Sequence, residues 1–263
     1  MKSLAVLWWS LRHNCLVNNN WLPRALEESR ARGFLGPGAI ELQIAHSEGF
    51  AHCWEGHSPT PPESFLDLGS GGGLPGLVLL QRWACRAVFI DSMEKRTNFL
   101  REVLERTGAP LGGQVVTGRA EDLARDPQFA STFDLVTARS FGPPAVVAEC
   151  AVRFLKIGGV LVVSEPPDDD DRSRWNHKAL TKLGLHDNGR VRFGAAFRIL
   201  VKVRPTPRSF PVRLALWRLW PNTPFFFSRL GEYWFGQNNP MMQMGAGGTT
   251  NPLLGPAFTG TVR

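Results

Sequence analysis

The sequence predicts an α/β protein with a mostly parallel sheet and a nucleotide-type site at the end of its first strand. The stretch Phe65 to Gly76 (FLDLGSGGGLPG) has the pattern of a buried strand end, a glycine turn and the start of an apolar helix. Glycine suits such a turn because it adopts positive φ and lets a ligand approach the backbone amides. From Phe65 onward, apolar strand patterns alternate with helical ones, which is typical of parallel βαβ units.

The elements follow from local periodicity and from their start and stop signals. Helices are expected at 22–32, 37–54, 75–83, 93–107, 145–155 and 175–183. Strands are expected to end near Leu66 and to span 87–90, 114–117, 133–138 and 160–164, the last after the Gly158-Gly159 turn, with a closing hairpin at 190–193 and 196–203. Ser92 is expected to cap the helix that begins at Met93.

Composition divides the chain into three parts. Residues 1–62 form an N-terminal helical extension and connector, 63–204 the ligand-binding domain, and 205–263 an irregular C-terminal tail. The tail crowds Trp and Phe and then becomes rich in Gly, Asn, Thr and Met, so we expect part of it to be disordered. The run Asp168 to Asp171 is expected to be a solvated acidic loop.

Charge and cysteine usage limit the class of protein. The 263 residues carry a formal net charge of +7, which favours a polyanionic partner such as RNA. The four cysteines are scattered without a CxxC pair, which indicates reduced thiols in a cytoplasmic protein. Charged residues and proline interrupt the apolar stretches, so no membrane span is expected. We also expect the protein to be a monomer.

A cluster of possible metal ligands lies in the second predicted helix and its connector. His46, His52, Cys53 and His57 fall close together, but their spacing matches no closed zinc pattern. No metal site is therefore expected.

Polar residues at the carboxyl ends of three predicted strands should converge on one ligand. Asp67 precedes the glycines, where a carboxylate can meet an ammonium group. Asp91 ends the second strand, where an acid accepts hydrogen bonds from ribose hydroxyls. Ala120 and Glu121 follow the third strand, where they can hold an adenine. Amine, ribose and adenine together indicate S-adenosylmethionine.

An NAD(P)-dependent oxidoreductase is the competing interpretation, because Gly71, Gly73 and Gly76 satisfy the GxGxxG pattern. An acid at Asp67 would repel a pyrophosphate. The single tyrosine, Tyr233, lies outside the predicted core, so no Tyr-x-x-x-Lys pair is available. A methyltransferase is the favoured alternative.

Four stretches resemble, in order and spacing, the bacterial 16S ribosomal RNA guanine-N7 methyltransferases of the RsmG/GidB family. They are LDLGSGGGLPGLVL, DSMEKRTNFLREV, GRAEDL and FDLVTARSF, and the resemblance covers roughly residues 35 to 165. It implies a Rossmann-like class I methyltransferase fold that binds S-adenosyl-L-methionine. It also implies cofactor contacts at Gly69, Leu74, Ala120 and Glu121, with Arg139 beside cofactor and substrate and Arg119 near the RNA.

The resemblance further implies methyl transfer to a guanine N7 in small-subunit ribosomal RNA. Guanine N7 has an exposed lone pair, so we expect positioning by Arg139 and Arg119 to matter and name no general base. The family usually carries a lysine after the fifth strand, where this chain has Glu165 and Pro166. This departure leaves open a small-molecule methyltransferase or a catalytically silent paralogue that binds RNA or the ribosome.

Overall fold

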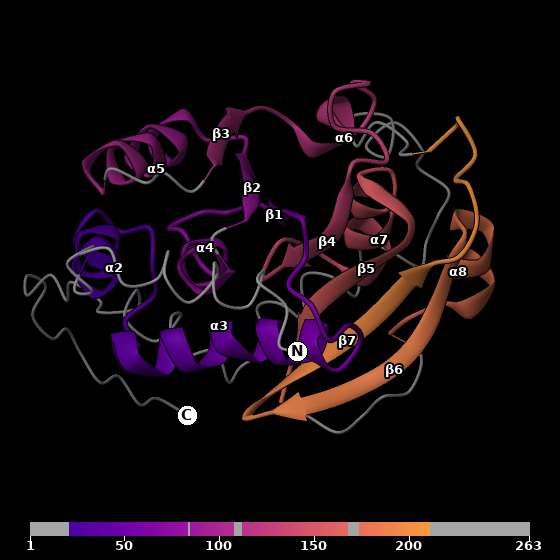
Figure 1. The fold of residues 1–263 in the computed structure, drawn as a ribbon, viewed down its shortest axis with the longest axis horizontal. Helices are drawn as coiled ribbons and strands as arrows, with labels where there is room; N and C mark the ends of the chain where they lie inside the picture. Colours follow the sequence, from indigo (N-terminus) through magenta and orange to yellow (C-terminus); the bar gives the residue numbers. More distant parts are fainter. Residues whose placement is uncertain (1–20, 84, 108–111, 168–173, 211–263) are drawn as a thin grey trace, which may run out of the picture. The chain divides into compact units, whose positions relative to one another are not determined.

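A seven-stranded sheet forms the centre of the protein (Figure 1). A computed structural model describes residues 21–83, 85–107, 112–167 and 174–210. The strand order is β3-β2-β1-β4-β5-β7-β6. Strands β1 to β5 pair in parallel, β7 pairs antiparallel with β5, and β6 pairs antiparallel with β7 at the edge of the sheet. The predicted α/β class, with a mostly parallel sheet and a closing hairpin, is confirmed.

The strands carry apolar residues on both faces, as expected where helices cover both sides of a parallel sheet. Their bounds are β1 (Ser64–Leu68), β2 (Arg86–Asp91), β3 (Gly113–Thr117), β4 (Phe133–Ala138), β5 (Leu155–Glu165), β6 (Leu185–Phe193) and β7 (Ala195–Lys202). Consecutive residues of β1 belong to different cores, with Phe65 on one face and Leu66 on the other.

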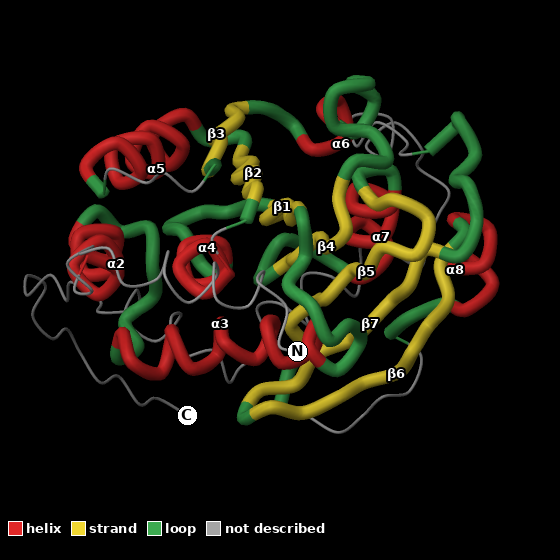
Figure 2. The backbone as a smooth tube through the Cα atoms, in the orientation of Figure 1, coloured by secondary structure: helices red, strands yellow, loops and turns green. Residues whose placement is uncertain are grey.

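The helices divide between the two faces of the sheet, as Figure 2 shows. Their bounds are α2 (Trp21–Ala31), α3 (Ile40–Glu55), α4 (Gly76–Trp83), α5 (Glu94–Arg106), α6 (Ala120–Leu123), α7 (Pro144–Val152) and α8 (His177–Leu183). Helices α2 to α5 share one core, which includes Leu26, Phe50 and Phe99. Helices α6 to α8 share the other. The predicted N-terminal extension thus packs in the same core as the ligand-binding domain.

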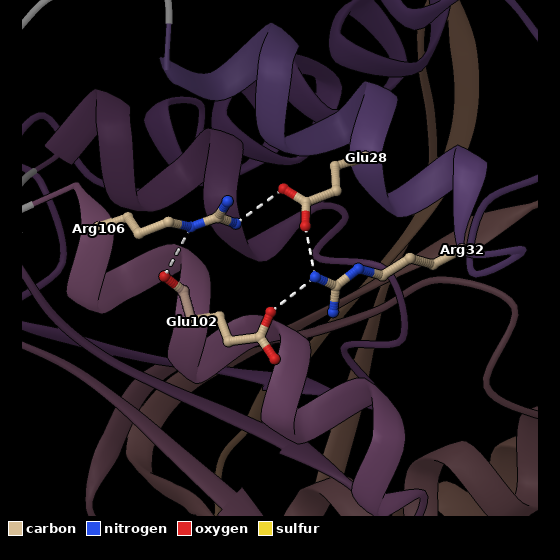
Figure 3. Close-up of polar contacts among 4 residues, drawn as sticks. All are labelled: Glu28, Arg32, Glu102 and Arg106. Carbon is tan, nitrogen blue, oxygen red and sulfur yellow. Dashed lines mark hydrogen bonds and ion pairs between the residues drawn. The ribbon is translucent and has the colours of Figure 1, made fainter.

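Ion pairs join α2 to α5 on the surface (Figure 3). Arg32, which directly follows α2, contacts Glu102 at 2.7 Å, and Arg106 of α5 contacts Glu28 at 2.8 Å. Arg32 also pairs with Glu28, so the four side chains form one network, which we call the α2–α5 clasp. The guanidinium of Arg32 lies 5.0 Å from the ring centroid of Phe99, which places the network directly over the core.

Two predicted details are wrong, and one element was not predicted. Strand β5 begins at Leu155 and α7 ends at Val152, because Leu155 already pairs with Phe133 of β4. The predicted turn at Gly158-Gly159 lies in an irregularity within β5, after which the pairing with β4 resumes at Val160. Helix α5 has Met93 as its N-cap residue, and the Met93 N–H is taken by the Asp91 carboxylate, so Ser92 is not the cap. The segment after β3 forms a short helix, α6, that the sequence does not predict.

Two predictions fall outside the described residues, namely the acidic run Asp168 to Asp171 and the tail beyond residue 210. The domain limits at 62 and 204 stay predictions. Among the helices that the structure describes, none combines the length and the apolar character needed to cross a bilayer.

Candidate active site

Residues 69–75, here called the glycine loop, connect β1 to α4 at the carboxyl end of the sheet. Gly69, Gly71 and Gly73 have φ values of 72°, 51° and 102°, a region that only glycine adopts without strain. The Ser70 N–H donates to the Ile90 carbonyl at 2.9 Å and ties the loop to β2. Since β2 and β4 flank β1 on opposite sides, the loop lies at the switch point where α/β sheets bind ligands.

The glycines of the loop differ in what surrounds them. A Cβ at Gly72 would lie 2.3 Å from the Ser29 hydroxyl oxygen, and one at Gly69 would lie 2.5 Å from the Phe141 ring. A Cβ at Gly71 would meet only the Gly69 carbonyl oxygen, at 3.7 Å. Gly71 is therefore the loop position with open space for a ligand beside the backbone.

Asp67 lies in β1 and is 1% exposed, and both of its carboxylate oxygens accept hydrogen bonds. The Gly76 N–H donates to Oδ2 at 3.1 Å, and the Thr137 hydroxyl donates to Oδ1 at 2.9 Å. Burial raises the pKa of Asp67 to about 6, although these hydrogen bonds and the charge of Arg139 oppose the shift. The carboxylate thus links the glycine loop to β4, and its contact with a ligand ammonium group stays a prediction.

Asp91 supports the glycine loop from the end of β2. Its Oδ2 accepts a hydrogen bond from the Gly71 N–H at 3.0 Å, and its Oδ1 accepts one from the Met93 N–H at 2.8 Å. Arg96 lies 3.5 Å from the same Oδ2. Asp91 is only 6% exposed, although it ends its strand, because the glycine loop folds back over its carboxylate. Each carboxylate oxygen can still accept a further hydrogen bond.

The predicted adenine contacts lie at the start of α6. Ala120 and Glu121 are 7% and 6% exposed, and Arg119 donates from Nε to Glu121 Oε1 at 3.0 Å. Among the described residues, the side chain that pairs with the Glu121 carboxylate is therefore Arg119. The Leu74 side chain is buried among the residues of the α2–α5 core, so it is the backbone of Leu74 that can face a ligand.

Arg139 follows β4 and is held by a residue that sequence reasoning missed. Its Nη2 donates to Oε1 of Gln43 on α3. Its Nη1 is buried and has no hydrogen-bond partner among the described residues. Burial lowers the pKa of Arg139, and the charge of Asp67 opposes that shift. Nη2 of the guanidinium is thus held by Gln43, whereas Nη1 has a donor capacity that no described residue uses.

A second polar contact lies next to Arg139. His46 Nε2 and the Ser164 hydroxyl are hydrogen-bonded at 3.1 Å. Burial and the charge of Arg139 lower the pKa of His46 to about 4, so the imidazole is neutral at physiological pH. The sequence singles out His46 only as a possible metal ligand. Within the described part of the chain, no group of three or more His, Cys, Asp or Glu side chains is placed to hold a metal ion.

The carboxylate of Glu165, where the resemblance leads us to expect a lysine, is buried inside the protein. Its Oε2 lies 2.8 Å from Arg174 Nη1, and its Oε1 accepts a hydrogen bond from the Trp175 indole at 3.0 Å. Glu165 therefore joins the end of β5 to the segment that leads into α8.

Comparison with known proteins adds to this geometry. A family model described as rRNA small subunit methyltransferase G (GidB) matches residues 43–195. A ribosomal RNA small subunit methyltransferase G from Symbiobacterium thermophilum is 34% identical over 66% of this chain and 75% of the relative. A protein of the same name from Lactobacillus delbrueckii subsp. bulgaricus is 36% identical over 55% of this chain and 64% of the relative.

A solved structure shows the same fold. The O-methyltransferase from Bacillus cereus, in complex with SAH, matches with a TM-score of 0.52 and 15% identity, over 74% of this chain and 96% of that one. At this level of identity the similarity concerns the fold alone, and it confirms the Rossmann-like class I methyltransferase fold.

Proposed function

The chain belongs to the rRNA small subunit methyltransferase G family, and we propose that it transfers the methyl group of S-adenosylmethionine to a guanine N7 of small-subunit ribosomal RNA. The observation that carries the proposal is the buried Nη1 of Arg139, which has no hydrogen-bond partner among the described residues, in a side chain whose charge acts on the Asp67 carboxylate below the glycine loop. Family membership decides against the NAD(P)-dependent oxidoreductase. The net charge of +7 suits an RNA acceptor.

The residues around the glycine loop fit S-adenosylmethionine. Gly71 leaves open space beside a backbone that Asp91 holds in place, and Asp91 retains lone pairs for ribose hydroxyls. Asp67 supplies a negative charge near the loop that would offset a ligand ammonium group. Residues 120 and 121, with the backbone of residue 74, would hold the adenine end. When bound, this cofactor supplies an electrophilic methyl group.

The reaction asks the protein for positioning more than for proton transfer. Guanine N7 carries an available lone pair and needs no deprotonation, so no side chain is proposed as a general base. Arg139 would fix the guanine edge or a phosphate next to the cofactor. Arg119, whose side chain is 55% exposed, would contact the RNA from the rim of the site. Both roles use the guanidinium as a hydrogen-bond donor.

Transfer of a tritiated methyl group from S-adenosylmethionine tests the proposal. The purified protein, which we propose to act as a monomer in the cytoplasm, is incubated with small ribosomal subunits, free 16S RNA and small-molecule extracts, and any labelled base is mapped. We expect label at a guanine N7, at a rate that falls steeply with added salt because phosphate contacts release counterions. Label only in small molecules would contradict the RNA acceptor, and cofactor binding without any label would indicate a catalytically silent paralogue.

A further inference from the structure

The Arg139 side chain is oriented by a residue of helix α3 and not by a residue of β4, the strand that it follows. The Gln43 side chain amide on α3 accepts from Nη2, while Nη1 is buried without a partner in the described residues. A buried donor without an acceptor is costly, and its partner is usually a water or a ligand. The Nη1 arm therefore marks where an acceptor atom of a ligand would lie.

Helix α3 presents a second polar residue to the same place. Gln43 and His46 are three positions apart, so they lie on one face of the helix. The imidazole of His46 is fixed by the Ser164 hydroxyl at 3.1 Å and by the Phe197 ring, whose centroid lies 5.5 Å away in an edge-on contact. Because this imidazole is neutral, it adds no second positive charge beside Arg139.

The sheet explains why these residues meet at the glycine loop. Ala138 of β4 pairs with Val163 of β5, so Arg139 and Ser164 follow at the carboxyl ends of neighbouring parallel strands. Thr137, two residues before Arg139, donates to Asp67 beneath the loop. The polar group of Gln43, His46, Arg139 and Ser164 thus adjoins the cofactor residues on the β5 side of β1.

We propose that Gln43 and His46 are positioning residues for the acceptor base: Gln43 holds one arm of Arg139 so that the other donates to guanine O6, and His46 with Ser164 forms the adjoining wall. This inference rests on the proposed function, since it names residues that recognise the acceptor of the same site. An adenine presents an amino donor where guanine presents O6, so the Nη1 arm would favour guanine over adenine.

A double-mutant cycle tests the role of Gln43. Gln43→Met removes the acceptor and keeps an apolar side chain of similar length, and kcat for methyl transfer is expected to fall about 10-fold, the usual scale for losing a hydrogen bond to a charged group. In the Arg139→Ala background the same change should alter kcat less than about twofold, because its effect acts through Arg139. Equal effects in both backgrounds would overturn the proposal.

The role of His46 is tested with His46→Phe, which keeps an aromatic ring between Phe50 and Phe197 but cannot bond Ser164. We expect KM for small subunits to rise, with the dissociation constant of S-adenosylmethionine unchanged. Glu41→Gln, an exposed change on the same helix, serves as the control and should leave both quantities unchanged. A His46→Phe enzyme with the kinetics of the wild type would contradict this part of the proposal.

A binding measurement separates this inference from the proposed function. In the presence of S-adenosylhomocysteine, the wild-type protein should bind GMP more tightly than AMP by NMR titration, and Gln43→Met should lose that preference. A protein that prefers GMP but labels no ribosomal subunit would count against the RNA acceptor alone. A wild-type protein that binds GMP and AMP equally would overturn the inference, whatever its activity.

Discussion

The hydroxyl of Ser29 donates a hydrogen bond to the carbonyl of Gly72 over 2.9 Å and so joins α2 to the glycine loop. Ser29 is completely buried, and a Cβ at Gly72 would collide with it. The helix that precedes the predicted ligand-binding domain is therefore part of the wall that shapes the loop.

Ser29→Ala should weaken cofactor binding as well as stability, because the Gly72 carbonyl is left without its partner. The loss of one buried hydrogen bond costs about 1 kcal/mol, or about fivefold in affinity. Calorimetric titration with S-adenosylmethionine measures the affinity, and thermal unfolding measures the stability. Ser47→Ala is the matched control, since that buried hydroxyl bonds the Gln43 carbonyl within α3 at 2.9 Å. Equal affinities in the two variants would argue against a loop-shaping role for Ser29.

Asp91→Ala should reduce the affinity for S-adenosylmethionine by about 10- to 150-fold, the range for losing a charged hydrogen-bond partner. It should also lower the melting temperature, because the Gly71 and Met93 N–H groups lose their acceptor. Asp91→Asn retains one acceptor oxygen, so its cofactor affinity and its melting temperature should both lie between those of the wild type and those of Asp91→Ala. Unchanged affinity with a lower melting temperature would show that Asp91 serves the loop alone.

The stability of the protein should depend on the pH through Asp67. The folded-state pKa of this carboxyl is about 6 against an ordinary 3.8, so the folded protein holds the proton more tightly. Its contribution to the free energy of unfolding is fully present below the ordinary value and is lost as the pH rises through about 6, an effect of about 3 kcal/mol. Urea unfolding at several pH values measures the free energy of unfolding. As the pH rises from about 3.8 to about 6, this free energy should decline less for Asp67→Asn than for the wild type. If the free energy of unfolding depends on pH in the same way in both proteins, Asp67 does not have the raised pKa.

Arg139→Ala should depress methyl transfer more than cofactor binding, because its free Nη1 is directed at the acceptor in our proposal. We expect a loss of about 10- to 100-fold in kcat with the cofactor affinity changed less than about threefold. Arg139→Lys restores the charge but not the planar fork, so it should recover only part of the rate. Parallel losses of rate and cofactor affinity would instead make Arg139 a cofactor residue.

Glu28→Gln should have a small and salt-sensitive effect on stability. Hydrogen bonds from Arg106 and Arg32 lower the pKa of Glu28, but the clasp lies at the surface, where such pairs contribute about 0.5 kcal/mol. The difference in unfolding free energy should vanish in about 0.5 M NaCl. Glu27→Gln, which affects only a pair within α2, is the control. A large effect that salt does not reduce would indicate that the clasp does more than pair charges.

The parts of the fold that local patterns determine were accessible from the sequence. The glycine turn is one of them, because positive φ at Gly69, Gly71 and Gly73 restricts the residue type directly. The alternation of apolar strands and amphipathic helices is another. The start of β5 was missed because pairing with β4, and not the local sequence around Gly158, decides that it is a strand.

The acceptor side of the site was beyond local reasoning. Gln43 and Arg139 are 96 positions apart, and His46 and Ser164 are 118 apart. Their contacts depend on how α3 crosses the sheet, and nothing in the spacing of polar residues along α3 encodes that docking. The i, i+3 spacing of Gln43 and His46 shows that they share a face, but not which strands that face meets.

Because β1 lies between β2 and β4, the sheet is incomplete at β1 while the protein is being synthesised. In a nascent chain β1, the glycine loop and β2 are synthesised well before β4, since Thr137 of β4 lies 70 positions beyond Asp67, its hydrogen-bond partner. Until β4 is translated, one side of β1 remains an open edge that can pair with another chain. Chains that stop before β4 would therefore carry the complete glycine motif yet be prone to aggregate, and expression fragments of this protein should extend at least through β4.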